Sequence, residues 1–259
     1  MMDVNTSGDR MRKNGKRNGI RLRRIVVPAL CLAVLLCAFV IYAGDFSRAD
    51  DEAIGSYDAG GRPEERMLPD GSYAVGPADA EAGFVFYPGG KVEHRAYLPL
   101  ARSIASGGVL CVVCRMPFRL AVLGTHAADR IREMFPDVGT WYLGGHSLGG
   151  AVAAIEASKH TGAYEGMVLL AAYSTKDLSG EPLRALSAYG SEDGVLDREK
   201  YASCRKNLPA DAREIVIGGG CHAGFGMYGP QKGDGVPLIT HEEQIRFTAG
   251  EILAWMGAS

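Results

Sequence analysis

Residues 140–151 read TWYLGGHSLGGA, and the GHSLG at positions 145–149 fits the pattern G-x-S-x-G. A strand-like run, 140–143, precedes this pattern, and an alanine-rich helical run begins at residue 151. In a nucleophile elbow, the serine occupies a sharp, strained turn between a buried strand and a helix, and glycines let neighbouring backbone approach closely. The order of these features predicts such an elbow with Ser147 at its tip.

Two other structures also join a strand to a helix through glycines. A serine at this place can simply cap the helix. A dinucleotide-binding loop needs G-x-G-x-x-G and an acidic residue about 20 positions later, at the tip of the next strand. The next expected strand ends in LLAAY at residues 169–173 and has no carboxylate there. The sequence thus argues against the dinucleotide loop and leaves the capping serine as the alternative.

The charge of the chain is distributed very unevenly. The 259 residues carry a net charge of -2, yet residues 1–24 hold eight Lys or Arg against two Asp, a balance of +6, which leaves -8 for the remainder. A basic tail can bind nucleic acid, but the run that follows it is apolar, so we predict a membrane and no nucleic acid as the partner. The length suits one sizeable α/β domain.

Residues 25–43 read IVVPALCLAVLLCAFVIYA and contain no charged residue. A helix of this length is about 28 Å long, close to the ~30 Å hydrocarbon core of a bilayer. The basic flank should stay in the cytoplasm, which places the rest of the chain on the outer face. We therefore predict a single-pass signal anchor in the cell membrane. The alternative is a signal peptide that is cleaved after the small residues Ala43 and Gly44, which would make the protein secreted.

The pattern along the chain predicts four parts: a basic cytoplasmic tail at 1–24, the anchor at 25–43, a linker and irregular lead-in at 44–82 and one domain at 83–259. The lead-in contains one expected edge strand near 72–75. In the domain we expect strands at 84–87, 109–113, 140–143, 167–171, 186–189 and 215–217, and helices at 97–106, 127–135, 151–157, 197–206 and 242–256. This alternation indicates an α/β fold with a mainly parallel sheet, helices on both faces and no large lid domain.

The cysteines suggest packing rather than chemistry. Cys111 and Cys114 lie in an apolar strand, CVVC, where residues three apart point to opposite faces of a sheet. We therefore expect two buried thiols there, without a disulfide or a metal ion. The sequence leaves open whether Cys204 and Cys221 pair.

A serine hydroxyl needs a base to become a nucleophile, and a third group must orient that base. In proteins with this elbow, the acid and then the histidine follow the serine along the chain. Asp193, in the turn that follows the expected strand 186–189, is the predicted acid. Glu192 and Asp197 are the alternative acids, although they can equally be a solvated charge or a helix N-cap. Asp177 is expected on the surface and is a minor candidate for the acid.

His222 is the predicted base, because it follows the last strand through three glycines, and such a flexible exit can carry an imidazole back over the sheet. The other histidine beyond Asp193 is His241, in the polar start of the final helix. His146 lies inside the elbow and is assigned a packing or orienting role. Zinc needs four clustered ligands and the histidines are scattered, so we predict no metal and no cofactor. The remaining three histidines are expected on helix surfaces: His94, His126 and His160.

An oxyanion hole needs two backbone N–H donors. The residue after the nucleophile, Leu148, supplies the first, at a helix N-terminus whose partial positive charge favours an anion. The second should come from the loop PGGKV at residues 88–92, and by position it is Gly90 or Lys91.

From residue 83 to about 256 the chain resembles the alpha/beta hydrolase superfamily, and within it the small single-domain branch similar to dienelactone hydrolases. Four stretches carry the resemblance: GFVFYPGGKVEHRAYLPLA, GGHSLGG, YGSEDG and GGGCHAGFGMYGPQKGD. The resemblance implies a Ser147–His222–Asp193 triad, with Leu148 and Gly90 or Lys91 as oxyanion donors. Ser147 stands where dienelactone hydrolases carry a cysteine.

The expected function is that of a serine esterase, which cleaves a small carboxylic ester or a related acyl substrate through an acyl-enzyme. Because of the predicted anchor, transfer of the acyl group to a lipid or an envelope sugar is the alternative. A catalytically idle fold that serves as a binding module is the third, and the filled triad positions argue against it. Six residues near strand ends are expected either in an apolar pocket or in the core: Tyr87, Met116, Phe118, Phe225, Met227 and Tyr228.

Overall fold

The computed structural model describes residues 6–61, 63–160 and 162–257, and the chain divides into two compact units, Met1–Asp45 and Phe46–Ser259. The first unit contains the helix α1 (Thr6–Gly44). Within it, Arg24–Tyr42 is long and apolar enough to cross a membrane. A signal sequence near an N-terminus has the same length and composition.

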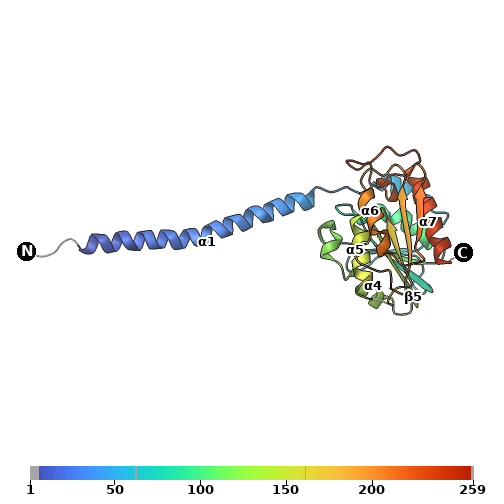
Figure 1. Cartoon of the computed structure of the whole chain (residues 1–259), viewed down its shortest axis with the longest axis horizontal. Helices are drawn as coiled ribbons and strands as arrows, with labels where there is room; N and C mark the ends of the chain where they lie inside the picture. Colours follow the sequence, from blue (N-terminus) through green and yellow to red (C-terminus); the bar gives the residue numbers. More distant parts are fainter. Residues whose placement is uncertain (1–5, 62, 161, 258–259) are drawn as a thin grey trace, which may run out of the picture. The chain divides into compact units, whose positions relative to one another are not determined.

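The second unit is built on one twisted sheet (Figure 1). In the described residues, its eight strands lie in the order β1-β2-β4-β3-β5-β6-β7-β8. The strands are β1 (Glu65–Met67), β2 (Tyr73–Val75), β3 (Ala82–Tyr87), β4 (Leu110–Val113), β5 (Thr140–His146), β6 (Gly166–Leu170), β7 (Arg184–Gly190) and β8 (Arg213–Ile217). β2 pairs antiparallel with β1 and β4, and all the other neighbours are parallel.

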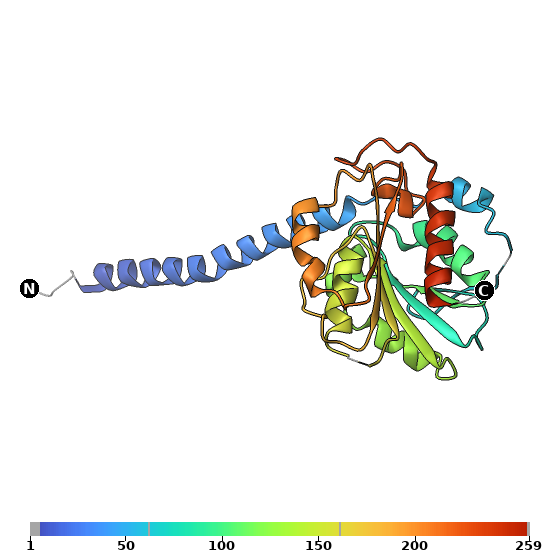
Figure 2. The same cartoon turned by 45° about the vertical axis from the view of Figure 1, so that its right-hand side comes forward.

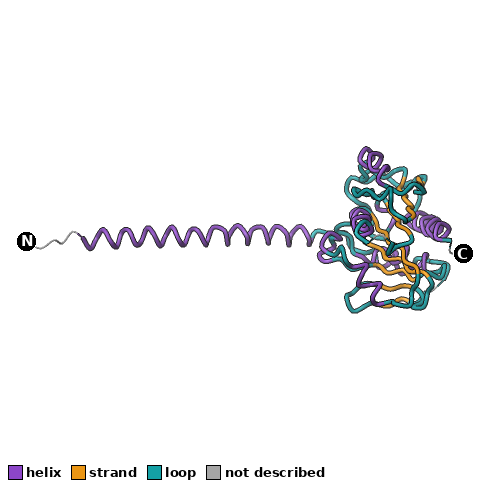
Figure 3. The backbone as a smooth tube through the Cα atoms, turned by 60° about the horizontal axis from the view of Figure 1, so that its bottom comes forward, coloured by secondary structure: helices purple, strands orange, loops and turns teal. Residues whose placement is uncertain are grey.

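Helices cover both faces of this sheet, as the tube of Figure 3 also shows. One face carries α3 (Leu98–Ala105) and α7 (His241–Met256), and the other carries α4 (Ala127–Met134) and α5 (Leu148–Ala157). In Figure 2, α7 in red lies on one side of the sheet, and α5 in yellow-green and α6 (Arg198–Cys204) in orange lie on the other. The predicted α/β fold is therefore confirmed.

Alternating side chains of the strands divide the core into two layers. Phe84 and Phe86 of β3 pack with α3 and α7, whereas Val85 and Tyr87 pack with α4 and α5. All six strands and five helices expected after residue 83 are present, with ends shifted by a few residues. The two largest shifts matter for function, because β5 continues through His146 and α5 begins at Leu148, which leaves Ser147 alone between them.

The segment before residue 83 has more structure than its sequence predicts. A short helix, α2 (Asp51–Ser56), buries Ile54 in the core, and the predicted edge strand near 72–75 is present as β2. It is not an edge strand, because β1 pairs with its outer side. A strand of three residues is too short to show the alternation by which strands are recognised, so β1 was missed.

The cysteines lie where the alternation argument placed them. Cys111 and Cys114 are both buried, one in each core layer, and both are free thiols. Desolvation in the core raises the pKa of each thiol far above its ordinary value. Cys204 and Cys221 are also free, so the disulfide that the sequence left open is not formed.

The first turn of α5 packs tightly against β3. A Cβ atom on Gly149 would overlap the carbonyl oxygens of Tyr87 and Pro88, which are backbone atoms of β3 and its exit. We expect Gly149→Ala to lower the free energy of unfolding by about 3 kcal/mol or more, because backbone has to move. Urea unfolding followed by circular dichroism measures this loss.

Gly139→Ala is the matched control, because a Cβ atom there meets open space just before β5. It should change the free energy of unfolding by no more than about 1 kcal/mol. Equal urea unfolding midpoints for Gly149→Ala and Gly139→Ala would contradict the close approach of α5 to β3.

Candidate active site

Ser147 lies in a strained turn between β5 and α5. Its φ of 53° and ψ of -122° belong to a region that favours glycine, and such backbone costs about 1–3 kcal/mol. Its N–H donates to the carbonyl of Leu170 at 2.8 Å, which fixes the turn against β6. Its side chain makes no capping hydrogen bond with α5. The capping alternative is therefore excluded, and the hydroxyl group is available for another role.

The Ser147 side chain opens into a cavity of about 340 Å³. Leu148 and His222 also line it, together with Ala171–Tyr173 after β6 and Leu196. The six residues expected in a pocket or in the core do not line this cavity. Phe118 is exposed. The other five are buried: Tyr87, Met116, Phe225, Met227 and Tyr228.

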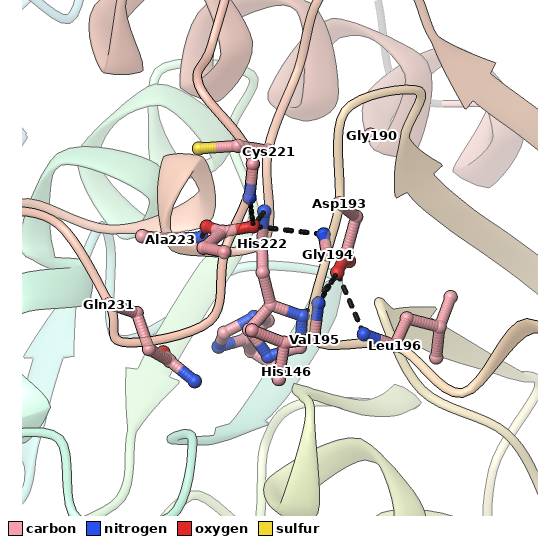
Figure 4. A network of polar contacts seen from close by, with 12 residues as sticks. His146, Gly190, Asp193, Gly194, Val195, Leu196, Cys221, His222, Ala223 and Gln231 are labelled. Carbon is pink, nitrogen blue, oxygen red and sulfur yellow. Dashed lines mark hydrogen bonds and ion pairs between the residues drawn. The ribbon is translucent and has the colours of Figure 1, made fainter.

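Asp193 and His222 form a buried pair beside this cavity. The Asp193 Oδ2 atom lies 2.9 Å from Nδ1 of His222, and its Oδ1 accepts the N–H groups of Val195 and Leu196 at 2.9 and 2.8 Å. Figure 4 shows these two backbone bonds and the imidazole of His222 next to the ring of His146. The carboxylate is thus fully occupied and its orientation is fixed.

The second ring nitrogen of His222, Nε2, is buried and has no hydrogen-bond partner in the described part of the chain. The ring therefore has one nitrogen held by a carboxylate and one left for another group. Ser147 and His222 line the same cavity, and His222 contacts Asp193, but no hydrogen bond joins the Ser147 hydroxyl to Nε2 of His222.

The alternative acids have other positions. Asp197 caps α6 and accepts the N–H of Lys200 at 2.9 Å, and Glu192 accepts the hydroxyl of Ser191. Asp177 is exposed and binds Ser179, whose hydroxyl and N–H lower the pKa of that carboxyl.

Two backbone N–H groups of this region have no hydrogen-bond partner among the described residues: those of Leu148, which lines the cavity, and Gly90. Gly90 lies directly against Leu148, since a Cβ atom on the glycine would come within 2.9 Å of the leucine side chain. The N–H of Lys91 instead donates to the carbonyl of Arg119 at 2.9 Å. Of the two predicted second donors, the geometry therefore favours Gly90.

His146 links the elbow to this loop. Its Nδ1 lies 2.9 Å from the hydroxyl of Tyr97, which also accepts the N–H of Gly89 at 3.1 Å. Its ring centroid is 4.5 Å from that of His222. Burial, and then repulsion from His222, lowers the pKa of His146 well below its ordinary value, so this ring stays neutral at pH 7.

Asp234 is a polar residue of the site that the sequence did not reveal. Its Oδ1 accepts the N–H groups of His222 at 3.0 Å and Gly194 at 3.2 Å, and its Oδ2 accepts that of Ala223 at 2.8 Å. One carboxylate thus joins the turn that carries His222 to the turn that carries Asp193. No local signal marks it, because its partners lie 11, 12 and 40 residues away.

The charge of Asp234 should therefore stabilise the fold. Burial raises the pKa of this carboxyl, but its backbone N–H donors outweigh that effect and hold the pKa below the ordinary value. A depressed pKa means that the stabilisation is complete above about pH 4 and is lost as the pH falls through the lower folded-state pKa. At pH 7, Asp234→Asn should lower the free energy of unfolding by about 1–2 kcal/mol.

Urea unfolding at pH 7 and at pH 3 measures this effect, and the difference between the variant and the wild type should shrink at the lower pH. Asp211→Asn, at an exposed carboxylate, is the control and should change little at either pH. An Asp234→Asn variant as stable as the wild type at pH 7 would contradict the bridging role.

Residues 83–246 match the sequence model of the alpha/beta hydrolase family. Among curated proteins, none matches this sequence. Solved structures with the same fold include a dienelactone hydrolase from Anabaena variabilis, with 13% identity and a TM-score of 0.56 over 75% of this chain and 99% of that one. Est1E from Butyrivibrio proteoclasticus has 12% identity and a TM-score of 0.53 over 77% and 100%. The esterase domain of a Rhodothermus marinus protein has 14% identity and a TM-score of 0.52, over 74% of this chain and 95% of that one.

Proposed function

The chain belongs to the alpha/beta hydrolase family and is a hydrolase, and we propose that it cleaves carboxylic esters through Ser147, His222 and Asp193. The observation that supports this most directly is the state of the His222 ring. One nitrogen is held by the carboxylate of Asp193. The other is buried and has no hydrogen-bond partner among the described residues, and the residue lines the same cavity as a strained serine. An oriented ring with one free nitrogen, close to a strained serine, supports the role of a general base.

In the proposed reaction, Oγ of Ser147 attacks the acyl carbonyl while Nε2 of His222 takes its proton. Asp193 holds the ring by Nδ1 and stabilises the imidazolium that forms. The oxyanion accepts hydrogen bonds from the N–H groups of Leu148 and Gly90. His222 then returns the proton to the leaving alcohol, and a water molecule, activated by the same ring, releases the acyl group from Ser147.

The cavity suggests a short acyl group. Its volume of about 340 Å³ is at the lower end of the range for small-molecule sites, which is about 300–1,000 Å³. Ala151, Ala171 and Ala172 contribute apolar lining close to Ser147. A short acyl chain can cover these surfaces, whereas a long one has to extend into solvent. We further propose that Arg24–Tyr42 anchors the enzyme in the cell membrane, with a cleaved signal sequence as the alternative.

The nucleophile can be tested by substitution and by labelling. Ser147→Ala should lower kcat by about 10⁴–10⁶-fold, because the general base then has no hydroxyl to activate. The variant should also fail to react with a fluorophosphonate probe, while its circular dichroism stays that of the wild type. The assay uses a p-nitrophenyl ester and the purified full-length chain.

Ser203→Ala, at an exposed serine on α6, is the matched control and should keep both activity and labelling. His222→Ala should lower kcat as much as Ser147→Ala, and the double variant should lose little more, since the two residues act as a unit. A folded Ser147→Ala chain that keeps its activity would rule out the proposed mechanism.

Acyl preference can be tested with p-nitrophenyl esters of graded chain length. We expect kcat/KM to be highest for acyl chains of about two to four carbons and at least about 10-fold lower for twelve, because each methylene outside the cavity remains in water. Values of kcat/KM that stay equal or rise with chain length would exclude the small acyl site.

Adding a glycerol acceptor separates hydrolysis from acyl transfer, since transfer gives the glycerol ester in place of the free acid.

A further inference from the structure

A cluster of four ionisable side chains lies on the sheet face that carries α4 and α5. It consists of His126, Asp129, Glu156 and His160, and one nitrogen or oxygen atom from each lies within 4.8 Å of all the others. His126 and Asp129 come from the start of α4, whereas Glu156 and His160 come from the end of α5 and the turn after it. The two histidines, expected on separate helix surfaces, thus meet because their helices pack side by side.

Four distances in this cluster are close to those between the ligand atoms of one metal ion. Nδ1 of His126 lies 3.6 Å from Glu156 Oε1 and 3.8 Å from Asp129 Oδ2. Nε2 of His160 lies 3.2 Å from Glu156 Oε1 and 3.6 Å from Asp129 Oδ2. A tetrahedral zinc ion with bonds of about 2.0–2.1 Å separates its ligand atoms by roughly 3.4 Å. Most of the measured separations are too long for hydrogen bonds but suit a shared ion.

Glu156 provides an independent reason to expect a ligand. Its side chain has no exposed surface, yet neither carboxylate oxygen has a hydrogen-bond partner in the part of the chain that the structure describes. A buried carboxylate without hydrogen bonds is costly, and it normally has a partner or binds a metal. The chain therefore leaves a buried acid that needs a positive charge at this place.

The neighbouring cations do not fill that need. The ammonium of Lys159 lies 3.9 Å from Oε2 of Glu156, and the guanidinium of Arg132 lies 3.8 Å from Oδ1 of Asp129. Both contacts are at the edge of ion-pair range, and both involve the carboxylate oxygens other than the ones nearest the imidazoles. The four remaining atoms, two nitrogens and two oxygens, lie within 4.8 Å of one another.

We propose that His126, Asp129, Glu156 and His160 bind one divalent transition-metal ion, with Zn²⁺ as the best fit. Two imidazoles and two carboxylates are a ligand set that zinc accepts, and four protein ligands complete its tetrahedron. A site that is closed in this way is structural, because no position is left for a substrate. The charge of +2 balances the two carboxylates, and His126, which is 63% exposed, gives the ion a path from solvent.

The proposed ion joins the start of α4 to the far end of α5. Ser147 precedes the first residue of α5, so Glu156 lies about 14 Å away along the helix axis. The ion therefore cannot contact a substrate bound to Ser147. Its expected effect is on the stability of the helix pair, and the proposal does not depend on the proposed reaction.

Metal binding can be measured on the full-length chain in detergent, with any affinity tag removed and the metal stripped by a chelator. Titration with Zn²⁺ in a calorimeter should give one ion per chain. At a free zinc concentration of about 100 times Kd, the Tm should rise by about 5–10 °C. Co²⁺ in place of Zn²⁺ should give the intense visible absorption of a tetrahedral site.

Substitutions locate the ion. His126→Ala and His160→Ala should each abolish the rise in Tm and weaken zinc binding at least 10-fold, and Glu156→Gln should do the same if it folds. Glu133→Gln, at an exposed carboxylate of α4 outside the cluster, should bind like the wild type, as should Ser147→Ala. The proposal is overturned if the wild-type chain binds no zinc, or if both histidine variants bind it as tightly as the wild type does.

Discussion

The structure depends on one tightly packed place, where the backbone of the β5–α5 turn touches that of β3. A Cβ atom on Gly145 or on Gly149 would overlap backbone atoms, and in both cases these include the carbonyl oxygen of Tyr87. This contact holds Ser147 in a conformation that an isolated chain would leave, at a cost of about 1–3 kcal/mol. The cost is tolerated because β5 pairs with β3 on one side and β6 on the other, so the turn has no direction in which to relax.

The remaining parts of the site are held by polar contacts between loops that are distant in sequence. Asp234 joins the turn of His222 to the turn of Asp193, and Tyr97 joins His146 in the elbow to Gly89 before the proposed oxyanion donor. In the proposed mechanism, each reacting group is thus positioned by a neighbour that does not react. Such neighbours matter because proton transfer requires hydrogen-bond distances, which flexible loops alone do not maintain.

The parts of this architecture that follow from local pattern were predictable. The G-x-S-x-G turn requires a strand before it and a helix after it, and the alternation of apolar strands with helices indicated the parallel sheet. Ser147, Asp193 and His222 each follow a strand, and the carboxyl ends of parallel strands meet at one edge, so their proximity follows from topology.

Features that depend on tertiary contacts were not predictable. Asp234 is one of several acidic residues in polar loops, and only the folded chain shows that its carboxylate accepts N–H groups from two other turns. The sequence could not decide between pocket and core for Tyr87 and Phe225, because both satisfy the same pattern in either place, and only the structure shows that they are buried in the core. His126 and His160 were expected on helix surfaces, but their proximity was not predicted, since the packing of α4 beside α5 is not encoded in either helix alone.

The two buried acids of this unit, each beside an imidazole, show how the same side chains serve different chemistry. Asp193 accepts two backbone N–H groups and contacts one histidine, so its charge is satisfied by hydrogen bonds and its partner ring is oriented. Glu156 is as deeply buried but has no hydrogen bond from the described residues, and its two histidines stand at distances that an ion would bridge. A carboxylate that is satisfied by the protein can orient a base. We propose that one left unsatisfied takes its compensating charge from a bound ion, and in the two proposals this difference assigns proton transfer to one cluster and metal binding to the other.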